Sequence, residues 1–249
     1  MPRRGLPLIV AVGLFIVLVG VAGEIVSGFG YRFHVWDLSA AFHMFVYGSF
    51  VAAAGGVLCL LAALATRPGT GRGGFGLSLL GLIIAIAGCG TVMQWRARAT
   101  KAPPIHDIST DLTNPPPFVA VLPLRANAPN SAVYDTSATD SVAEKQRRGY
   151  PDIQPVTLPV PPGAAFHVAL ATARDMGWAI VAADSSGGRI EATATTTWFG
   201  FKDDVVVRIA PDPKGSRIDV RSESRVGGSD VGTNAARIRK YQQRLTARV

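Results

Sequence analysis

Three apolar runs in the first hundred residues constrain this chain more than any other feature of its sequence. They cover residues 6–26, 40–65 and 75–94, and few charged or strongly polar residues interrupt them. A bilayer core of about 30 Å is crossed by about 20 apolar residues in a helix that rises about 1.5 Å per residue. We therefore predict three transmembrane helices within residues 1–101.

The first run also resembles a secretory signal peptide. Arg3 and Arg4 precede the apolar stretch, and Val21-Ala-Gly-Glu24 loosely resembles a cleavage site. The apolar core is, however, longer than the usual ~7–15 residues of a signal peptide. An uncleaved membrane anchor is therefore the preferred interpretation, and a cleaved signal peptide is the alternative.

The charges that flank the three runs bear on orientation. If the chain crosses the membrane three times, four basic residues lie on each side, so their number alone does not decide it. Arg3 and Arg4 precede the first helix, and a long C-terminal domain can be translocated largely regardless of its charge. We therefore expect a multi-pass protein of the plasma (inner) membrane, with the residues after 101 on the extracytoplasmic side.

The net charge of +8 does not indicate a nucleic-acid-binding protein. Residues 1–101 hold eight Lys and Arg against two acidic residues, whereas residues 102–249 hold seventeen against fifteen. Most of the excess therefore flanks the apolar runs, and we expect no nucleic-acid partner. Both cysteines, Cys59 and Cys89, lie within apolar runs, so the rest of the chain is predicted to have neither a zinc site nor a disulfide framework.

Three polar residues in or beside the apolar runs are candidates for a proton or ion path, because an ionisable group in hydrocarbon is costly without a partner. They are Glu24, His43 and Gln94. Glu24 and Gln94 lie at predicted helix ends, and His43 is close to aromatic residues typical of the membrane interface. Interfacial placement of all three is the preferred interpretation.

Residues 102–149 have the composition of an extended connector. Twelve of the seventeen prolines lie between Lys101 and Pro162, and proline does not continue a helix. Apolar residues accompany the prolines, so we expect the connector to wrap against a neighbouring surface and to contain a short helix at residues 141–147.

His106, Asp107 and Asp111 carry the nitrogen and oxygen atoms that bind metal ions. In an extended chain, neighbouring side chains point to opposite sides, and the spacing of these three residues matches no known set of ligands. We therefore expect neither a metal nor another cofactor.

Residues 150–249 are predicted to form one compact α+β domain. Helices are expected at residues 162–176 and 229–248, where apolar residues recur at helical spacing. Alternating apolar residues and tight turns between the helices predict four strands, at residues 178–183, 189–198, 205–210 and 217–221. This order indicates a four-stranded antiparallel sheet with two helices covering its apolar face.

The last quarter of the chain carries its most specific pattern. A first block runs Trp198-Phe-Gly-Phe-Lys-Asp-Asp204, and a second runs Arg221-Ser-Glu-Ser-Arg-Val-Gly-Gly-Ser-Asp-Val-Gly-Thr-Asn-Ala-Ala-Arg-Ile238. Together with the segments Ile105-His-Asp-Ile-Ser-Thr-Asp111 and Tyr150-Pro-Asp-Ile153, these blocks resemble the DUF1499 family, in the version with several membrane spans before the domain. The resemblance covers about residues 103–245 and implies a bacterial membrane protein whose domain has no established activity.

Part of this pattern is typical of an anion-binding site. Arginines leave a strand, glycines permit unusual backbone angles, and the free N–H groups of the following helix favour a phosphate or carboxylate. The candidate ligand-binding residues are Arg221, Arg225, Gly227, Gly228, Ser229, Asn234 and Arg237. In the alternative, carboxylates already neutralise the arginines and form a structural clamp between sheet and helix, with the members Asp203, Asp204, Arg225 and Asp230. The clamp is the preferred interpretation.

The sequence does not favour catalysis. The one histidine of the domain, His167, lies on the first predicted helix, far in sequence from the hydroxyl groups of the pattern. Asp203 and Asp204 are neighbours on a strand, so their side chains face opposite ways. We assign no catalytic residue and expect a non-enzymatic binding or scaffolding module of the cell envelope that contacts membrane lipid headgroups or an envelope protein. The alternative is a hydrolase or transferase acting on an anionic envelope substrate.

Overall fold

The computed structural model of the protein describes residues 7–135 and 141–249. The first predicted span begins just outside this range, at Leu6, and Arg3 and Arg4, which support the predicted orientation, also lie outside it. The described residues form two compact units, and each is presented by itself.

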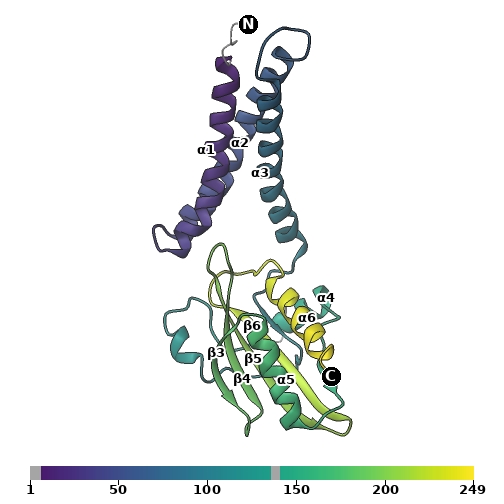
Figure 1. Ribbon diagram of the computed structural model, residues 1–249. Coiled ribbons are helices and arrows are strands. Elements are labelled where there is room, and N and C mark those ends of the chain that lie inside the picture. Colours follow the sequence, from purple (N-terminus) through teal and green to yellow (C-terminus); the bar gives the residue numbers. More distant parts are fainter. Residues whose placement is uncertain (1–6, 136–140) are drawn as a thin grey trace. The chain divides into compact units, whose positions relative to one another are not determined.

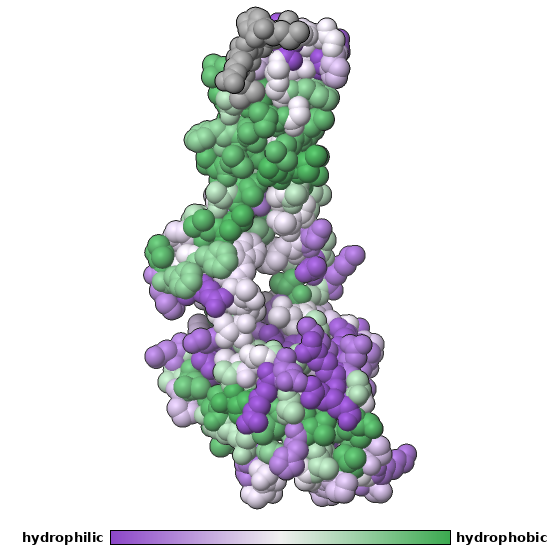
Figure 2. Space-filling model, in the orientation of Figure 1, coloured by the Kyte–Doolittle hydropathy of each residue, from purple (hydrophilic) through white to green (hydrophobic). Residues whose placement is uncertain are grey.

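The helical unit comprises the residues up to Ala97 together with Thr197–Gly200. It contains α1 (Leu8–Arg32), α2 (Leu38–Ala65) and, as far as Ala97, α3 (Phe75–Lys101). All three are long and apolar enough to cross a membrane, as predicted, which indicates membrane association. Figure 2 shows a broad band of apolar side chains on the outer surface of these helices, as expected of helices that face lipid.

Glycines allow the helices of this unit to approach one another closely. A Cβ atom added to Gly20 of α1 would lie 2.4 Å from the backbone nitrogen of Ala52 in α2. One added to Gly81 of α3 would lie 2.5 Å from the sulfur of Cys59, which is buried in α2. Small residues at these positions therefore permit the contacts between the helices.

The C-terminal unit contains an antiparallel sheet of six strands, not the predicted four. The predicted strands are present as a hairpin series, β3 (Ala179–Asp184), β4 (Arg189–Thr195), β5 (Lys202–Asp212) and β6 (Gly215–Ser224). Two further strands pair with the other edge of β6, namely β1 (Asp107–Ser109) and β2 (Val156–Leu158). The prediction missed them because a strand of three residues is too short to show an alternating pattern.

Helices α5 (Pro162–Asp175) and α6 (Thr233–Thr246) lie over one face of this sheet (Figure 1). Both were predicted, although α6 begins four residues later than expected. The reason is the backbone before it, where Val231 and Gly232 have φ angles of 54° and 81°, which a right-handed helix does not accept. The predicted short helix of the connector is α4 (Val142–Gly149).

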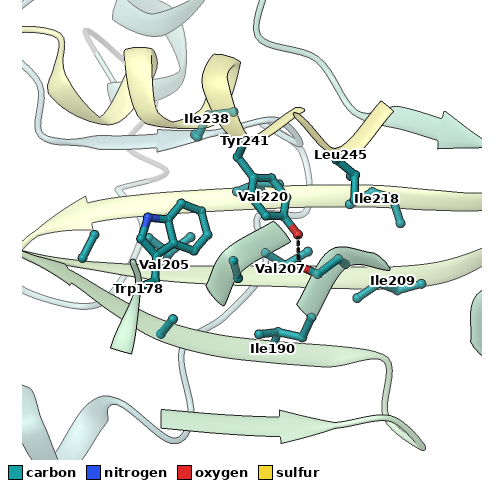
Figure 3. Packing of buried hydrophobic residues seen from close by; sticks show 14 of the residues in the cluster. Trp178, Ile190, Val205, Val207, Ile209, Ile218, Val220, Ile238, Tyr241 and Leu245 are labelled. Atoms are coloured by element: carbon teal, nitrogen blue, oxygen red, sulfur yellow. Dashed lines mark hydrogen bonds between the residues drawn. The ribbon is translucent and has the colours of Figure 1, made fainter. Parts of the chain in front are cut away.

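The apolar core fills the space between these two helices and the sheet (Figure 3). Alternate strand residues such as Ile190 and Val220 point into it and are at most 1% exposed. Tyr241 of α6 stacks on Trp178, with ring centroids 5.0 Å apart. Its hydroxyl donates to the carbonyl oxygen of Ala169 in α5 at 3.0 Å, so the buried phenol is satisfied and the two helices are joined.

The connector covers the opposite face of the sheet. Glu191 of β4 points to this face and is fully buried, and its carboxylate accepts hydrogen bonds from the backbone N–H groups of Val119 and Val121 at 3.0 Å each. Phe118 and Val121 pack against Val206 of β5. The sheet therefore has a layer of helices on one face and a layer of connector, held by both apolar and polar contacts, on the other.

Candidate functional site

A buried cluster of charged side chains lies between β5, β6 and the connector. It contains three arginines and three carboxylates, namely Arg125, Arg221, Arg225, Asp107, Asp204 and Glu223. The side chain of Arg225 is 14% exposed, and the other five are at most 4% exposed. Hydrogen bonds between the arginines and the carboxyl groups offset much of the cost of removing these groups from water.

Asp204 of β5 accepts hydrogen bonds from three side chains of this region. The guanidinium of Arg225 binds it in a bidentate manner, with Nε and Nη2 each 2.8 Å from a carboxylate oxygen. Arg125 donates at 2.8 Å, and the hydroxyl of Thr193 donates at 2.7 Å. Burial raises the pKa of Asp204, but these hydrogen bonds outweigh burial and hold the pKa below its usual value.

Arg221 and Glu223 occupy the other end of the cluster. Arg221 donates from Nε and Nη2 to the two carboxylate oxygens of Asp107, at 2.9 and 2.7 Å, and its guanidinium lies 4.7 Å from the ring centroid of Phe118. Glu223 accepts from Arg125 at 2.9 Å and from Arg221 at 3.2 Å. Burial and the neighbouring carboxylate of Asp107 raise the pKa of Glu223 to about 8.

The same arginines also bind the backbone of the connector. Arg225 donates to the carbonyl oxygen of Leu124, and Arg221 donates to that of Ala132, both at 2.9 Å. The side chain of Asn130 donates to two carbonyl oxygens around the end of β6, again at 2.9 Å. The cluster therefore fixes the connector to the sheet.

A second polar group lies on the other face of the sheet, at the start of α6. Arg237 donates to Asp203 at 2.5 Å and to the hydroxyl of Ser222 at 3.0 Å. Asn234 is fully buried and accepts from the hydroxyl of Ser222 at 2.7 Å. Asp203 and Asp204 thus face opposite sides of the sheet, as expected of neighbours on a strand.

The N-terminus of α6 is capped by a carboxylate of the protein itself. Asp230 accepts hydrogen bonds from the backbone N–H groups of Gly232 at 2.9 Å and of Asn234 at 2.5 Å. These N–H groups, together with the positive end of the helix dipole, are what an anion-binding helix offers to its ligand. Asp230 therefore takes the place that an anion would occupy at this helix end.

A pocket of about 280 Å³ lies beside this group, between the end of α5, the end of β4 and α6. Lys240 contributes a cation that is exposed and forms no ion pair with any residue that the structure describes. Thr195 and Thr233 contribute hydroxyl groups, and Trp178 contributes an aromatic wall. The other lining residues are Met176, Gly177, Ala194, Ala236 and Arg237.

A family model matches residues 107–245, which include the whole sheet, the charged cluster and the pocket, and this match covers more than half of the chain. The chain belongs to the DUF1499 family. The family is described as a protein of unknown function. No curated protein and no solved structure matches the chain. Because the match begins at residue 107, residues 107–149 of the connector belong to the matched family region.

The DUF1499 domain does not bring the candidate anion-binding residues together in one place. Arg221 and Arg225 lie on the connector face of the sheet, whereas Asn234 and Arg237 lie on the helix face. The remaining candidates belong to the turn between β6 and α6, namely Gly227, Gly228 and Ser229. The sheet itself therefore separates the two pairs of polar side chains.

The candidate clamp residues are also divided between the two faces. Asp204 and Arg225 form the bidentate pair on the connector face, while Asp203 binds Arg237 on the helix face and Asp230 caps α6. Two sets of contacts therefore hold the DUF1499 sheet, one toward the connector and one toward α6.

The sequence interpretation did not include Arg125 and Glu223. The alternation Arg221-Ser-Glu-Ser-Arg225 places its first, third and fifth residues on one strand face, and this signal could have identified Glu223. Arg125 lies 79 residues before Asp204, to which it donates, and no local pattern marks it.

The three candidate metal ligands of the connector have separate environments. Asp107 binds Arg221, and Asp111 accepts from Arg208 at 3.1 Å. Nδ1 of His106 is buried and has no hydrogen-bond partner within residues 7–135 and 141–249, and burial lowers the pKa of this histidine. Among the described residues, no group of three or more His, Cys, Asp or Glu side chains is arranged to hold a metal ion.

Proposed function

We propose that this DUF1499 protein is a membrane-anchored binding module whose ligand is the anionic headgroup of a lipid. The observation that carries the proposal is Lys240, a cation that folding leaves without an ion pair among the described residues, at the edge of a pocket with apolar and hydroxyl-bearing walls. The proposal includes the location expected from the sequence: the plasma membrane of a bacterium, with the domain in the extracytoplasmic part of the cell envelope.

The chemistry of the pocket fits an amphiphile. Trp178 and Met176 offer apolar surface to the first part of an acyl chain, whereas Thr195 and Thr233 offer hydroxyl groups to a polar headgroup. Lys240 adds a positive charge that favours a phosphate or carboxylate. A volume of about 280 Å³ is close to the lower limit of ~300 Å³ for small-molecule sites, which favours partial insertion of a lipid over its full enclosure.

The charged cluster supports a structural role for its arginines. Arg221 and Arg225 each bind a carboxylate in a bidentate manner and also bind connector carbonyl groups, so a ligand would have to displace both kinds of contact. We therefore propose that this cluster clamps the connector to the sheet and that the ligand binds in the pocket.

Binding is also favoured over hydrolysis or group transfer. The hydroxyl of Ser222 donates to Asn234 and accepts from Arg237, and neither of these partners is a base that would activate it as a nucleophile. His167 lies on the exposed side of α5, whereas Ser222 is fully buried under α6.

The test is native mass spectrometry of the full chain, purified in detergent and then supplied with a short-chain anionic phospholipid or its zwitterionic counterpart. We expect the wild-type protein to retain the anionic lipid preferentially. Lys240→Ala is expected to lose this preference, because it removes the unpaired cation. Lys214→Ala is the matched control, since it removes an exposed lysine from the turn between β5 and β6, outside the pocket.

Two results would contradict the proposal. One is an equal loss of anionic lipid in Lys240→Ala and Lys214→Ala, which would indicate a nonspecific effect of net charge. The other is the absence of a preference for the anionic lipid in the wild-type protein, which would favour an envelope protein as the partner of the domain.

A further inference from the structure

Glu24 is a buried carboxyl group inside the helical unit. The sequence placed it at the end of the first span, but α1 continues for eight residues to Arg32, which corresponds to about 12 Å of helix. Its side chain is directed toward the other two helices, and the residue is only 4% exposed. A polar group in this position belongs to the interior of the helical unit and not to its surface.

Glycines of the neighbouring helices make room for this carboxyl group. A Cβ atom added to Gly48 of α2 would lie 3.1 Å from Cγ of Glu24, and one added to Gly88 of α3 would lie 3.2 Å from both carboxyl oxygens. The carboxyl group is therefore enclosed between α2 and α3. Among the described residues, none forms an ion pair with it, and Oε1 has no hydrogen-bond partner.

The contacts of Thr91 are compatible with a protonated carboxyl group at Glu24. The hydroxyl of Thr91 lies 2.7 Å from the carbonyl oxygen of Gly88 and 3.4 Å from Oε2 of Glu24. A hydroxyl group has a single proton, and the shorter contact with Gly88 uses it. The oxygen of Thr91 still has a free lone pair, so it can accept a hydrogen bond from a protonated carboxyl group across the longer 3.4 Å contact.

The energetics of burial lead to the same assignment. An ionised carboxylate that is removed from water without a cation is strongly disfavoured, and a neutral acid avoids this cost. We propose that Glu24 is a proton-binding site of the helical unit, occupied in the packed state of the three helices, with Thr91 accepting the hydrogen bond of the bound proton. Release of the proton would leave a carboxylate enclosed between Gly48 and Gly88.

The proposal is tested with dicyclohexylcarbodiimide, an apolar reagent that adds to the protonated form of a carboxyl group and leaves a stable acylurea. The full chain in lipid nanodiscs is treated at several pH values, and the modified residues are identified by peptide mass mapping. We expect modification at Glu24, with a rate that falls about tenfold per pH unit above its midpoint. Glu24→Gln, which has nearly the same shape, serves to show that the product arises at this residue.

Asp37 is the internal control, because it is the exposed cap of α2 and accepts from the N–H group of Ala40. The proposal is overturned if Glu24 is unmodified at every pH, if Asp37 reacts equally, or if sodium ions protect Glu24, because protection would identify a metal-cation site. Thr91→Val supplies a second criterion. Loss of the acceptor should move the midpoint to lower pH, whereas a shift to higher pH would show that Thr91 donates to a carboxylate.

Discussion

Arg225, directly after β6, donates two hydrogen bonds of 2.8 Å each to the carboxylate of Asp204 in β5. Asp204 is fully buried, and the side chain of Arg225 is 14% exposed. Arg225 also binds the connector, because it donates to the carbonyl oxygen of Leu124 at 2.9 Å. One arginine therefore joins two strands and the segment that covers them.

Removal of this arginine is expected to destabilise the protein strongly. Arg225→Ala leaves Asp204 with Arg125 and Thr193 but without its bidentate partner, and breaking a buried pair costs about 3–5 kcal/mol. The measurement is the thermal unfolding of the full chain in detergent, followed by near-ultraviolet circular dichroism. A clear fall in the midpoint is expected.

Arg239→Ala is the control for that experiment. Arg239 also binds an aspartate, Asp152, but the two side chains are 43% and 55% exposed, and exposed pairs contribute about 0–1 kcal/mol. Equal shifts in Arg225→Ala and Arg239→Ala would contradict the clamp, since burial would then make no difference.

The raised pKa of Glu223 predicts a dependence of stability on pH. Its pKa is near 4.5 in the unfolded chain and about 8 in the folded domain, so the folded protein retains a proton that the unfolded chain loses between these values. The contribution of Glu223 to the free energy of unfolding is then fully present below about pH 4.5. It falls as the pH rises toward 8, by at most about 1.4 kcal/mol per pH unit. We expect a lower unfolding midpoint at pH 8.5 than at pH 5.5.

Glu223→Gln separates this effect from that of other groups. The amide keeps the shape of the side chain and does not titrate, so the midpoint of this variant should vary less between the two pH values. Asp204 has a lowered pKa, so its contribution is lost only as pH falls below the usual carboxyl range and does not affect this comparison. A wild-type slope no steeper than that of Glu223→Gln would exclude the assignment.

The elements that the sequence predicted are those with a long repeating pattern. The sequence shows the three apolar runs by their length. It shows α5, α6 and the hairpin strands by apolar residues that recur at a regular spacing, so that single exceptions do not obscure them. In β4 the alternation of Ile190 with Glu191 even separates the two faces of the sheet correctly. β1 and β2 were missed because their pairing depends on the free edge of β6 and not on a local pattern.

The partners within the candidate site were harder to predict for a related reason. The contact between Arg125 and Glu223 spans 98 residues, and the prolines around Arg125 indicate an extended chain without indicating where it lies. The partners of each arginine depend on the face of the sheet on which it lies. Arg225 and Arg237 are close in sequence but lie on opposite faces. Local spacing does not show this separation, because it does not reveal that the chain passes to the other face of the sheet between the two arginines.

The backbone conformation of Val231, in the turn between β6 and α6, predicts that a substitution at this position stabilises the domain. Its φ angle of 54° is unusual for a β-branched residue, and such a conformation costs about 1–3 kcal/mol. Val231→Gly removes this cost but increases the freedom of the unfolded chain by about 0.4–1 kcal/mol. We expect a net gain of about 1 kcal/mol, measured as a higher unfolding midpoint. Val226→Gly, in the same segment but without a positive φ angle, should lower the midpoint, and a loss of stability in Val231→Gly would disprove the inferred strain.

The close approach of α1 and α2 at Gly20 predicts that one added methyl group lowers the stability of the helical unit. An added Cβ atom would lie 2.4 Å from the nitrogen and 2.8 Å from the Cα atom of Ala52, both of them backbone atoms that cannot rotate away. Gly20→Ala should therefore force α1 and α2 apart and lower the midpoint of thermal unfolding in detergent. Gly76→Ala in α3 is the matched control, because an added Cβ atom there meets no atom within 4 Å. Since alanine favours helix by about 1 kcal/mol over glycine, Gly76→Ala should leave the midpoint unchanged or raise it. A similar response of the two variants would mean that α1 and α2 do not depend on this close approach.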